Sequence, residues 1–344
     1  PVEGAPHASC LAVVRDFLFL GGLLDDGRAV RWSGLDRPDD WPDPGSDEAQ
    51  LYRTSKDGLF EADNTFNAIR IDGLSAATEY EYRLTSKRML SFEPYKVVFG
   101  EQITSPWYSF RTFDPAADEV TFVVANDIHD DAQKCAALLD LMPMQEVDMV
   151  FYNGDIMSHF SREGQPFTSF IDVSVERFAS HKPFAVVRGN HETRGPGFSE
   201  YLNLFPSSTN TPYFMFREGP AAFIVLDSGE DKPDNDIEYG GTAAYGPYRE
   251  ELAKWLSEAI ESEEFKSAPV KIALLHIPFS KGDGWYGNNE LKRLFLPLLN
   301  KAGIDLMLSG HNHRYSLHEP MSCDGNEFPI LVNSNNDRLD VKAT

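Results

Sequence analysis

The sequence predicts an α/β domain preceded by an all-β domain, because its hydrophobic pattern changes near residue 115. Before that position, short segments alternate apolar and polar residues, as half-buried strands do. After it, near-continuous apolar runs alternate with segments of helical periodicity, which is typical of strands buried on both faces of a sheet. The chain of 344 residues also exceeds the usual size of one hydrophobic core. We therefore expect two domains, residues 1–114 and 115–344.

The N-terminal part contains three strand-like patterns. Residues 68–74 and 80–84 alternate apolar and polar side chains, and residues 107–113 form a last strand before Asp114-Pro115, a boundary signal. The stretch from Gly73 to Arg83 resembles the corner between two late strands of fibronectin type III sandwiches. Two further segments, 34–50 and 90–106, are expected to be long loops.

The C-terminal part alternates buried strands with helices. Between the strands lie segments of helical periodicity, the clearest of which has Leu291, Phe295 and Leu298 on one face. The predicted helices are 132–141, 248–260 and 289–300. The predicted strands are 120–125, 147–152, 183–187, 221–226, 270–275 and 304–308.

The composition limits the classes of partner. The formal charge of −23 would repel a nucleic-acid backbone at long range, so we expect no nucleic-acid backbone binding. An anionic small substrate would need a site where bound metal cations reverse the local field. We expect no membrane span, because the apolar stretch 11–24 is short and is interrupted by Arg15 and Asp16. Nothing in the sequence indicates the oligomeric state.

Polar residues of one chemical kind follow the predicted strands. In open α/β sheets the carboxyl ends of the strands form the ligand crevice. We therefore expect carboxylate, amide and imidazole side chains to converge on one edge of the sheet. The residues concerned are Asp127, His129, Asp155, Asn190, His191, His276, His311 and His313.

These oxygen and imidazole donors, without thiolate, suit Mn, Fe, Zn or Co. They are too many for one ion but fit two ions that share a bridge, which Asp155 can provide with one carboxylate oxygen to each metal. Two divalent or trivalent transition metal ions are therefore the expected cofactors. The first ion would be completed by Asp127, His129 and His313, and the second by Asn190, His276 and His311.

The ordered motifs resemble the calcineurin-like metallophosphoesterase superfamily over roughly residues 118–335. They are Asp127-X-His129, Gly-Asp155, Gly-Asn190-His-Glu, a lone His276 and Gly-His311-X-His313. The resemblance implies a four-layer α/β/β/α sandwich. A sandwich domain before this core is similar to the architecture of purple acid phosphatases. The purple enzymes, however, have a metal-binding tyrosine where this chain has Ser158, and they lack the first-motif histidine that is His129 here.

The resemblance also implies roles for the residues around the metals. His191 would face the substrate, stabilising the phosphoryl oxygens or protonating the leaving group, so the expected catalytic residues are His191, Asn190 and Asp155. Glu192 would fix a neighbouring imidazole or the loop itself. The expected substrate-binding residues are Asn190, His191, Arg188, Lys281, Trp285 and Tyr286.

We therefore expect a hydrolase that cleaves phosphate esters, phosphomonoesters foremost, by attack of a metal-bound hydroxide. The substrate would be a phosphorylated small molecule or another phosphoester. A phosphodiesterase or nucleotide-cleaving hydrolase is the alternative among enzymes. A metal-free protein-binding scaffold is the non-enzymatic alternative, and the loss of a metal ligand would favour it. The start at Pro1 and the sandwich-plus-phosphatase architecture lead us to expect an extracytoplasmic location, secreted or periplasmic.

Overall fold

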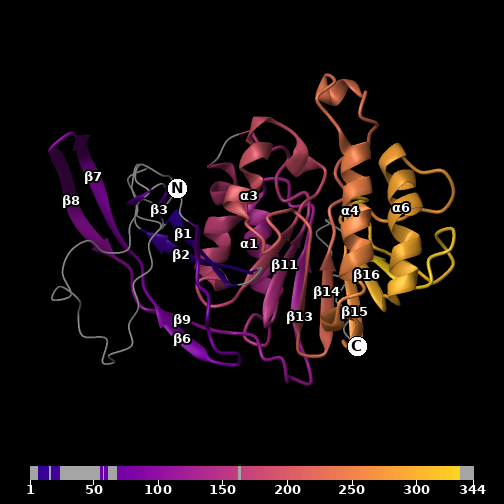
Figure 1. Cartoon of the computed structure of the whole chain (residues 1–344), viewed down its shortest axis with the longest axis horizontal. Coiled ribbons are helices and arrows are strands. Elements are labelled where there is room, and N and C mark those ends of the chain that lie inside the picture. Colours follow the sequence, from indigo (N-terminus) through magenta and orange to yellow (C-terminus); the bar gives the residue numbers. More distant parts are fainter. Residues whose placement is uncertain are drawn as a thin grey trace.

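Two six-stranded sheets form the centre of the molecule in the computed structural model (Figure 1). The structure describes residues 7–14, 17–23, 55–56, 58–60, 68–161 and 164–333. Within this part of the chain, no helix has the length and apolar character that a membrane crossing requires. The mixed α/β character predicted for the C-terminal part is confirmed.

The first sheet has the order β10-β11-β12-β2-β1-β5. Strands β10, β11 and β12 are parallel, and β2 joins β12 in the antiparallel sense at Leu18 and Phe184. Strand pairing therefore connects the N-terminal part to this sheet. The strands are β10 (Phe122–Ala125), β11 (Met149–Asn153), β12 (Phe184–Val187), β2 (Phe17–Leu23), β1 (His7–Val14) and β5 (Ala68–Arg70).

The second sheet has the order β13-β14-β15-β16-β18-β17, with β14, β15, β16 and β18 parallel to one another. Its two edge strands are antiparallel to their neighbours. The strands are β13 (Phe214–Glu218), β14 (Ala221–Val225), β15 (Val270–Leu274), β16 (Leu306–Ser309), β17 (Ser316–His318) and β18 (Ile330–Val332).

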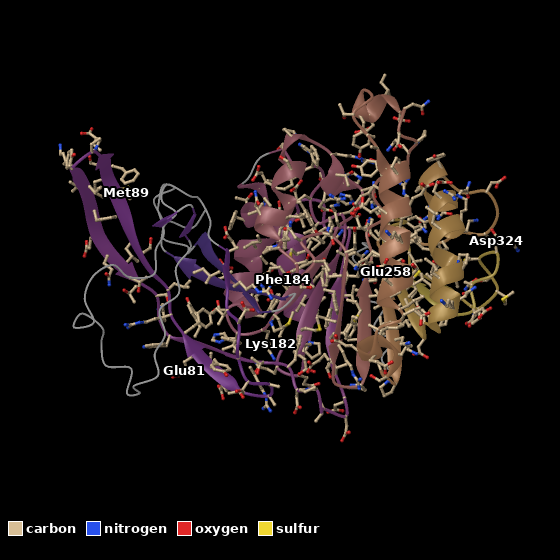
Figure 2. All side chains as sticks on the ribbon, in the orientation of Figure 1. Glu81, Met89, Lys182, Phe184, Glu258 and Asp324 are labelled. Carbon is tan, nitrogen blue, oxygen red and sulfur yellow. The ribbon has the colours of Figure 1, made fainter. Side chains whose placement is uncertain are left out.

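Three hydrophobic cores separate the layers. Alternate residues of a strand point to opposite faces, so Phe151 packs between the two sheets while Val150 and Tyr152 pack against the first helical layer. Phe184 lies in the same outer core, and Figure 2 shows it inside the molecule. The outer face of the second sheet forms the third core with α4 and α6.

The helices cover the outer faces of the two sheets (Figure 1). On the first sheet lie α1 (Ala132–Leu141), a π/α/π segment (η2 Phe167–Ile171, α2 Asp172–Ser174, η3 Val175–Ala179) and α3 (Tyr201–Leu204). On the second lie α4 (Tyr245–Ala259) and α6 (Tyr286–Ala302), with the short α5 (Glu263–Lys266). Asp131 caps α1 by accepting the backbone N–H of Lys134, and Gly303, with φ +67°, ends α6.

Apart from β1, β2 and β5, the strands described in the N-terminal part form smaller two-stranded sheets. Strand β6 (Glu79–Tyr82) pairs with β9 (Tyr108–Arg111), and Ser75 N–H donates to the hydroxyl of Tyr80, as in a tyrosine corner. The complete fibronectin-like sandwich stays a prediction, as does the division of the chain at residue 114. The remaining short strands are β3 (Ser55–Lys56) and β4 (Leu59–Phe60).

The segment predicted as a long loop at 90–106 is instead mostly a β-hairpin. Strands β7 (Thr85–Glu93) and β8 (Lys96–Thr104) pair with each other, and Met89 marks this projecting hairpin in Figure 2. The prediction was wrong because Val97, Val98 and Phe99 in β8 are a strand signal that the polar residues on either side obscured. The other predicted loop, 34–50, lies outside the described residues.

Candidate metal centre

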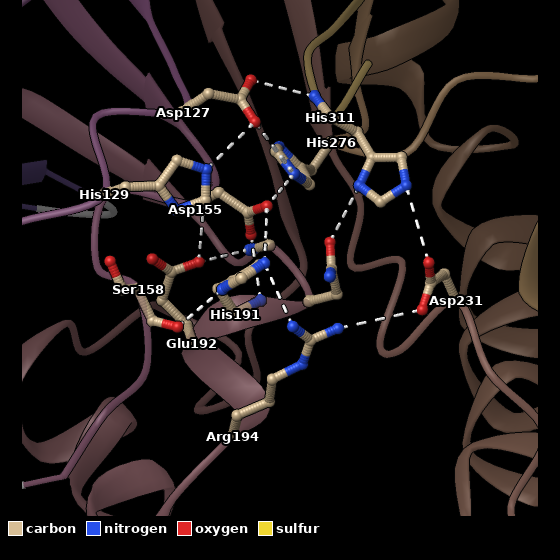
Figure 3. A network of polar contacts seen from close by, with 12 residues as sticks. Asp127, His129, Asp155, Ser158, His191, Glu192, Arg194, Asp231, His276 and His311 are labelled. Atoms are coloured by element: carbon tan, nitrogen blue, oxygen red, sulfur yellow. Dashed lines mark hydrogen bonds and ion pairs between the residues drawn. The ribbon is translucent and has the colours of Figure 1, made fainter. Parts of the chain in front are cut away.

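Both sheets present their donor residues at one edge (Figure 3). Asp127, Asp155 and Asn190 follow β10, β11 and β12, while His276 and the pair His311 and His313 follow β15 and β16. Several of these residues adopt the left-handed region, which is costly for side chains other than glycine. They are Asp127, His129, Asp155, His311 and His313, with φ between 52° and 69°. Such strain concentrated on one constellation is typical of a functional site.

The first group of donors is Asp127, His129 and His313. Nε2 of His313 lies 3.1 Å from both Oδ1 of Asp127 and Nε2 of His129. Oδ2 of Asp127 accepts hydrogen bonds from the side chain of Asn126 and the backbone of His311. Oδ1 is buried without a hydrogen-bond partner among the described residues. One carboxylate oxygen is therefore held by the protein, and the other faces two imidazoles.

The second group is Asp155, His276 and His311, with Asn190 beside it. Nδ1 of His276 lies 2.7 Å from the carbonyl oxygen of Asn153, so we assign the proton to Nδ1. Its Nε2 then faces Oδ2 of Asp155 at 2.9 Å without forming an aligned hydrogen bond. Nδ1 of His311 lies 3.0 Å from Oδ1 of Asn190.

In the second group, the charges of His276 and of the neighbouring carboxylates stabilise each other. Burial opposes charge on His276, but Asp155 and Asp127 outweigh burial and raise the pKa of His276 to about 10. Burial likewise opposes charge on Asp155, yet the His276 ring lowers the pKa of that carboxyl. Burial and the neighbouring His276 lower the pKa of His311 to about 4, so this ring stays neutral and able to bind a metal.

Asp155 belongs to the second group and directs one carboxylate oxygen at its histidines. Its Oδ1 accepts the backbone N–H of His191 at 2.9 Å, so Oδ2 is the oxygen directed at the histidines. The expectation that each oxygen of Asp155 would bind one metal stays a prediction. The glycines around it are required: a Cβ on Gly154 would collide with the ring of His276, and one on Gly189 with Oδ1 of Asp155.

His191 and Glu192 follow Asn190 on a short 3-10 turn, η4 (His191–Thr193). Nδ1 of His191 lies 2.6 Å from the carbonyl oxygen of Ser158, and its side chain is 27% exposed. Glu192 is buried and accepts the backbone N–H groups of Asp155, Met157 and Gly189. Burial and nearby Asp155 raise the pKa of Glu192 to about 7. Glu192 thus fixes the loops after β11 and β12 through their backbone, and among the described residues it forms no hydrogen bond with an imidazole.

The residues that were expected to contact the substrate occupy different environments in the structure. Arg188 donates to the fully buried Asp227 through Nε and Nη2, so its guanidinium is committed to the interior. This corrects its expected role in binding phosphate. Trp285 is 57% exposed and lies edge-on to His311, with ring centroids 4.8 Å apart. Lys281 lies in the exposed loop before Trp285, and Tyr286 begins α6.

Two residues near the site were missed by the sequence analysis (Figure 3). Nη1 of Arg194 lies 3.1 Å from Nε2 of His191. Oδ2 of Asp231 lies 3.8 Å from Nε2 of His311, and burial and the adjacent Glu230 raise the pKa of Asp231 to about 6. The only available signal for Arg194 was its position two residues after the Gly-Asn-His-Glu motif. Asp231 lies on a long loop whose path no sequence pattern indicated.

The donor atoms fit two transition metal ions. Oδ1 of Asp127, Nε2 of His276 and Nε2 of His311 are buried without hydrogen-bond partners in the described chain. Buried polar atoms are almost always paired, so the two orphaned atoms that face the donor groups, on Asp127 and His276, point to a bound cation there. Cys135 and Cys323 are buried elsewhere and supply no thiolate. The set is therefore a nitrogen and oxygen site of the kind that Mn, Fe, Zn and Co occupy.

Comparison with known proteins identifies the class of this fold and site. The family model described as calcineurin-like phosphoesterase matches residues 120–315, more than half of the chain. The chain therefore belongs to the calcineurin-like phosphoesterase family. This confirms the resemblance drawn from the ordered motifs.

Curated relatives include purple acid phosphatases of plants. Purple acid phosphatase 22 of Arabidopsis thaliana is 24% identical over 282 residues, which cover 76% of this chain and 56% of that protein. Purple acid phosphatase 18 of the same plant is 26% identical over 229 residues, 61% of this chain and 47% of the relative. The chain thus spans about half the length of these relatives.

A solved structure shares the fold. Purple acid phosphatase PPD1 from seeds of yellow lupin, Lupinus luteus, aligns with a TM-score of 0.54 and 16% identity. The alignment covers 96% of this chain and 64% of that one. At this identity the likeness concerns the fold alone.

Proposed function

We propose that this protein is a binuclear metal-dependent hydrolase that cleaves phosphate esters, with phosphomonoesters as its preferred substrates. The observation that carries the proposal is the convergence of two donor groups at one sheet edge. Two buried donor atoms of these groups, on Asp127 and His276, have no hydrogen-bond partner within the described residues. Asp155 lies in the second group and interacts electrostatically with both Asp127 and His129 of the first.

The residues of the chain divide the work in a defined way. Asp127, His129 and His313 would hold one ion, and Asn190, His276 and His311 the other, with Asp155 shared between them. When bound, two such ions supply charge neutralisation of the phosphate and activation of the attacking water. The neutral His311, fixed at Nδ1 beside Asn190, has the protonation state that metal binding needs.

His191 acts from the open side of the site. Its backbone N–H holds Oδ1 of Asp155, and its ring is anchored through Nδ1 to the carbonyl of Ser158. Nε2 is therefore the ring atom directed at a bound substrate, 3.9 Å from Oδ2 of Asp155. Once protonated at Nε2, the ring can stabilise a phosphoryl oxygen or supply a proton to the leaving group, a contribution of ~10²–10⁴-fold in rate.

A phosphodiesterase or nucleotide-cleaving activity is the second candidate. Trp285 favours it, because an exposed indole beside a metal-site histidine offers a surface on which a nucleobase can stack. A metal-free protein-binding scaffold is disfavoured, since every expected ligand position is occupied by a residue able to bind metal.

We further propose that residues 1–114 form an accessory fibronectin III-like sandwich of the purple acid phosphatase type, and residues 115–344 the catalytic domain. The tyrosine-corner hydrogen bond of Tyr80 supports this assignment. An extracytoplasmic location, secreted or periplasmic, is proposed with it, by analogy with that architecture.

The test is a panel of phosphomonoesters and phosphodiesters offered to protein reconstituted separately with Mn, Fe, Zn and Co. The proposal expects turnover that requires metal, is abolished by chelation and is fastest with a monoester. Faster turnover of diesters by every metal form would favour the second candidate. Absence of turnover and of metal binding in all forms would favour the scaffold.

A further inference from the structure

Arg194 lies at the open face of the metal centre, directly after the turn that carries His191 (Figure 3). Nδ1 of His191 faces a carbonyl oxygen, so we assign a donor role to Nδ1 and an acceptor role to Nε2. Nη1 of Arg194 is the donor to Nε2, at 3.1 Å. The guanidinium therefore sits one side chain away from Asp155, the residue proposed to bridge the metals.

Glu230 holds the guanidinium of Arg194 in a fixed orientation. Its fully buried carboxylate accepts Nε–H and Nη2–H of Arg194 at 2.8 and 3.0 Å, and it also accepts the hydroxyl of Tyr239 at 2.5 Å. The buried Arg249 in turn donates to the backbone carbonyl oxygens of Ser228 and Glu230. A bidentate pair anchored in this way leaves the arginine little rotamer freedom to lose when a ligand binds.

The fixed orientation leaves donors for a ligand. A guanidinium has five N–H groups, of which Glu230 accepts two and His191 one within the described residues. The carboxylate of Asp231 lies 3.9 Å from Nη2, beyond hydrogen-bond distance. The side chain is 17% exposed, so a small anion can reach it. The remaining donors belong to Nη1 and Nη2, the end of the group nearest His191.

We propose that Arg194 is a substrate-binding residue that holds a non-ester phosphoryl oxygen and thereby selects phosphomonoesters over phosphodiesters. This inference rests on the proposed function. A monoester has three non-ester oxygens, so one remains for Arg194 when two approach the metal positions. A diester has only two, and its third position is an ester oxygen, a weaker acceptor that carries a substituent. A guanidinium clamped by Glu230 cannot move aside for that substituent.

The selectivity experiment compares nitrophenyl phosphate with bis(nitrophenyl) phosphate, which share a leaving group. In Arg194→Ala, kcat/KM for the monoester should fall about 10- to 100-fold, as expected for loss of one hydrogen bond to a charged group. For the diester, kcat/KM should change by less than about threefold, because the diester makes no such hydrogen bond to Arg194. Arg177→Ala is the control, because Arg177 is a partly exposed arginine paired with Asp140 in the helical layer. Equal losses for both esters, or no loss for either, would overturn the proposal.

A binding measurement separates this inference from the proposed function. Inorganic phosphate should bind metal-loaded Arg194→Ala about 10- to 100-fold more weakly than the native protein by calorimetry, with metal content unchanged. Equal affinity would refute the role of Arg194 even in a protein that hydrolysed neither ester. Should Arg194→Ala fail to fold, Arg194→Lys is the second variant. The lysine keeps a cation for Glu230 but lacks the second terminal nitrogen of the guanidinium. It should show the same loss of selectivity.

Discussion

The stability of the metal-free protein should fall as the pH rises above 6.5, because of His276. The ring is fully buried, and its folded-state pKa of about 10 lies above the ordinary 6.5. A group whose pKa is raised by folding stabilises fully below its unfolded pKa and loses that contribution as the pH rises through its folded pKa. Each pKa unit corresponds to 1.36 kcal/mol, so the difference between 10 and 6.5 is worth at most about 5 kcal/mol. By pH 8.5, two units above 6.5, about 3 kcal/mol should be lost.

Urea denaturation of chelator-treated protein at pH 6.5, 7.5 and 8.5 measures this loss. His276→Asn is the matched control, since its amide can still donate to the carbonyl of Asn153 but does not titrate. It should be less stable at pH 6.5 and show little further change. Metal-loaded protein should also lose less stability over this pH range, because a metal ion takes the place of the proton on His276. A chelated native protein that is as stable at pH 8.5 as at pH 6.5 would refute the reasoning, as would an unchanged decline in His276→Asn.

Three further predictions follow from the same contacts. His191→Ala should lower turnover by ~10²–10⁴-fold while both metals stay bound. If the ring supplies a proton, the loss of turnover should be smaller for esters with good leaving groups. Full activity, or loss of a metal, would show that His191 has a different role. Iron-loaded protein should lack an intense purple band, since Ser158 replaces the expected tyrosine and Tyr152 is buried against Ser174; a visible band that Tyr152→Phe removes would contradict this. Asp227→Asn should destabilise the fold by about 3–5 kcal/mol in urea, because it leaves Arg188 buried without its charge partner; a loss below about 1 kcal/mol would mean the pair contributes little.

The elements of the C-terminal part could be predicted because each has a strong local pattern. Helix α1 has the predicted bounds, 132–141, since Asp131 caps its first turn. Helix α6 begins three residues before the predicted 289, in Tyr-Gly-Asn, which are poor helix formers. Gly287 packs against the backbone of Asp231, and this tertiary contact overrides propensity. Strands β17 and β18 have three residues each, too few to show a period.

The convergence of the donor residues could be predicted because their order along the chain follows the strand ends. The surroundings of the ligands could not, because they depend on contacts between distant segments. Arg188 and Arg194 flank the same motif, and nothing local distinguishes them. Arg188 pairs with Asp227, and Arg194 pairs with Glu230. Both acids belong to a segment whose path is set by the buried Arg249. Only the folded chain shows that Arg194 is the arginine at the open face.

The most direct test of the binuclear site is the metal stoichiometry of the reconstituted protein. Elemental analysis after removal of loosely bound ions should give about two transition metal ions per chain, because the donors form two groups. Asp155→Ala should lower the occupancy of both positions, since Asp155 is the shared ligand. A native stoichiometry of one or none, or loss of a single ion in Asp155→Ala, would contradict the binuclear centre.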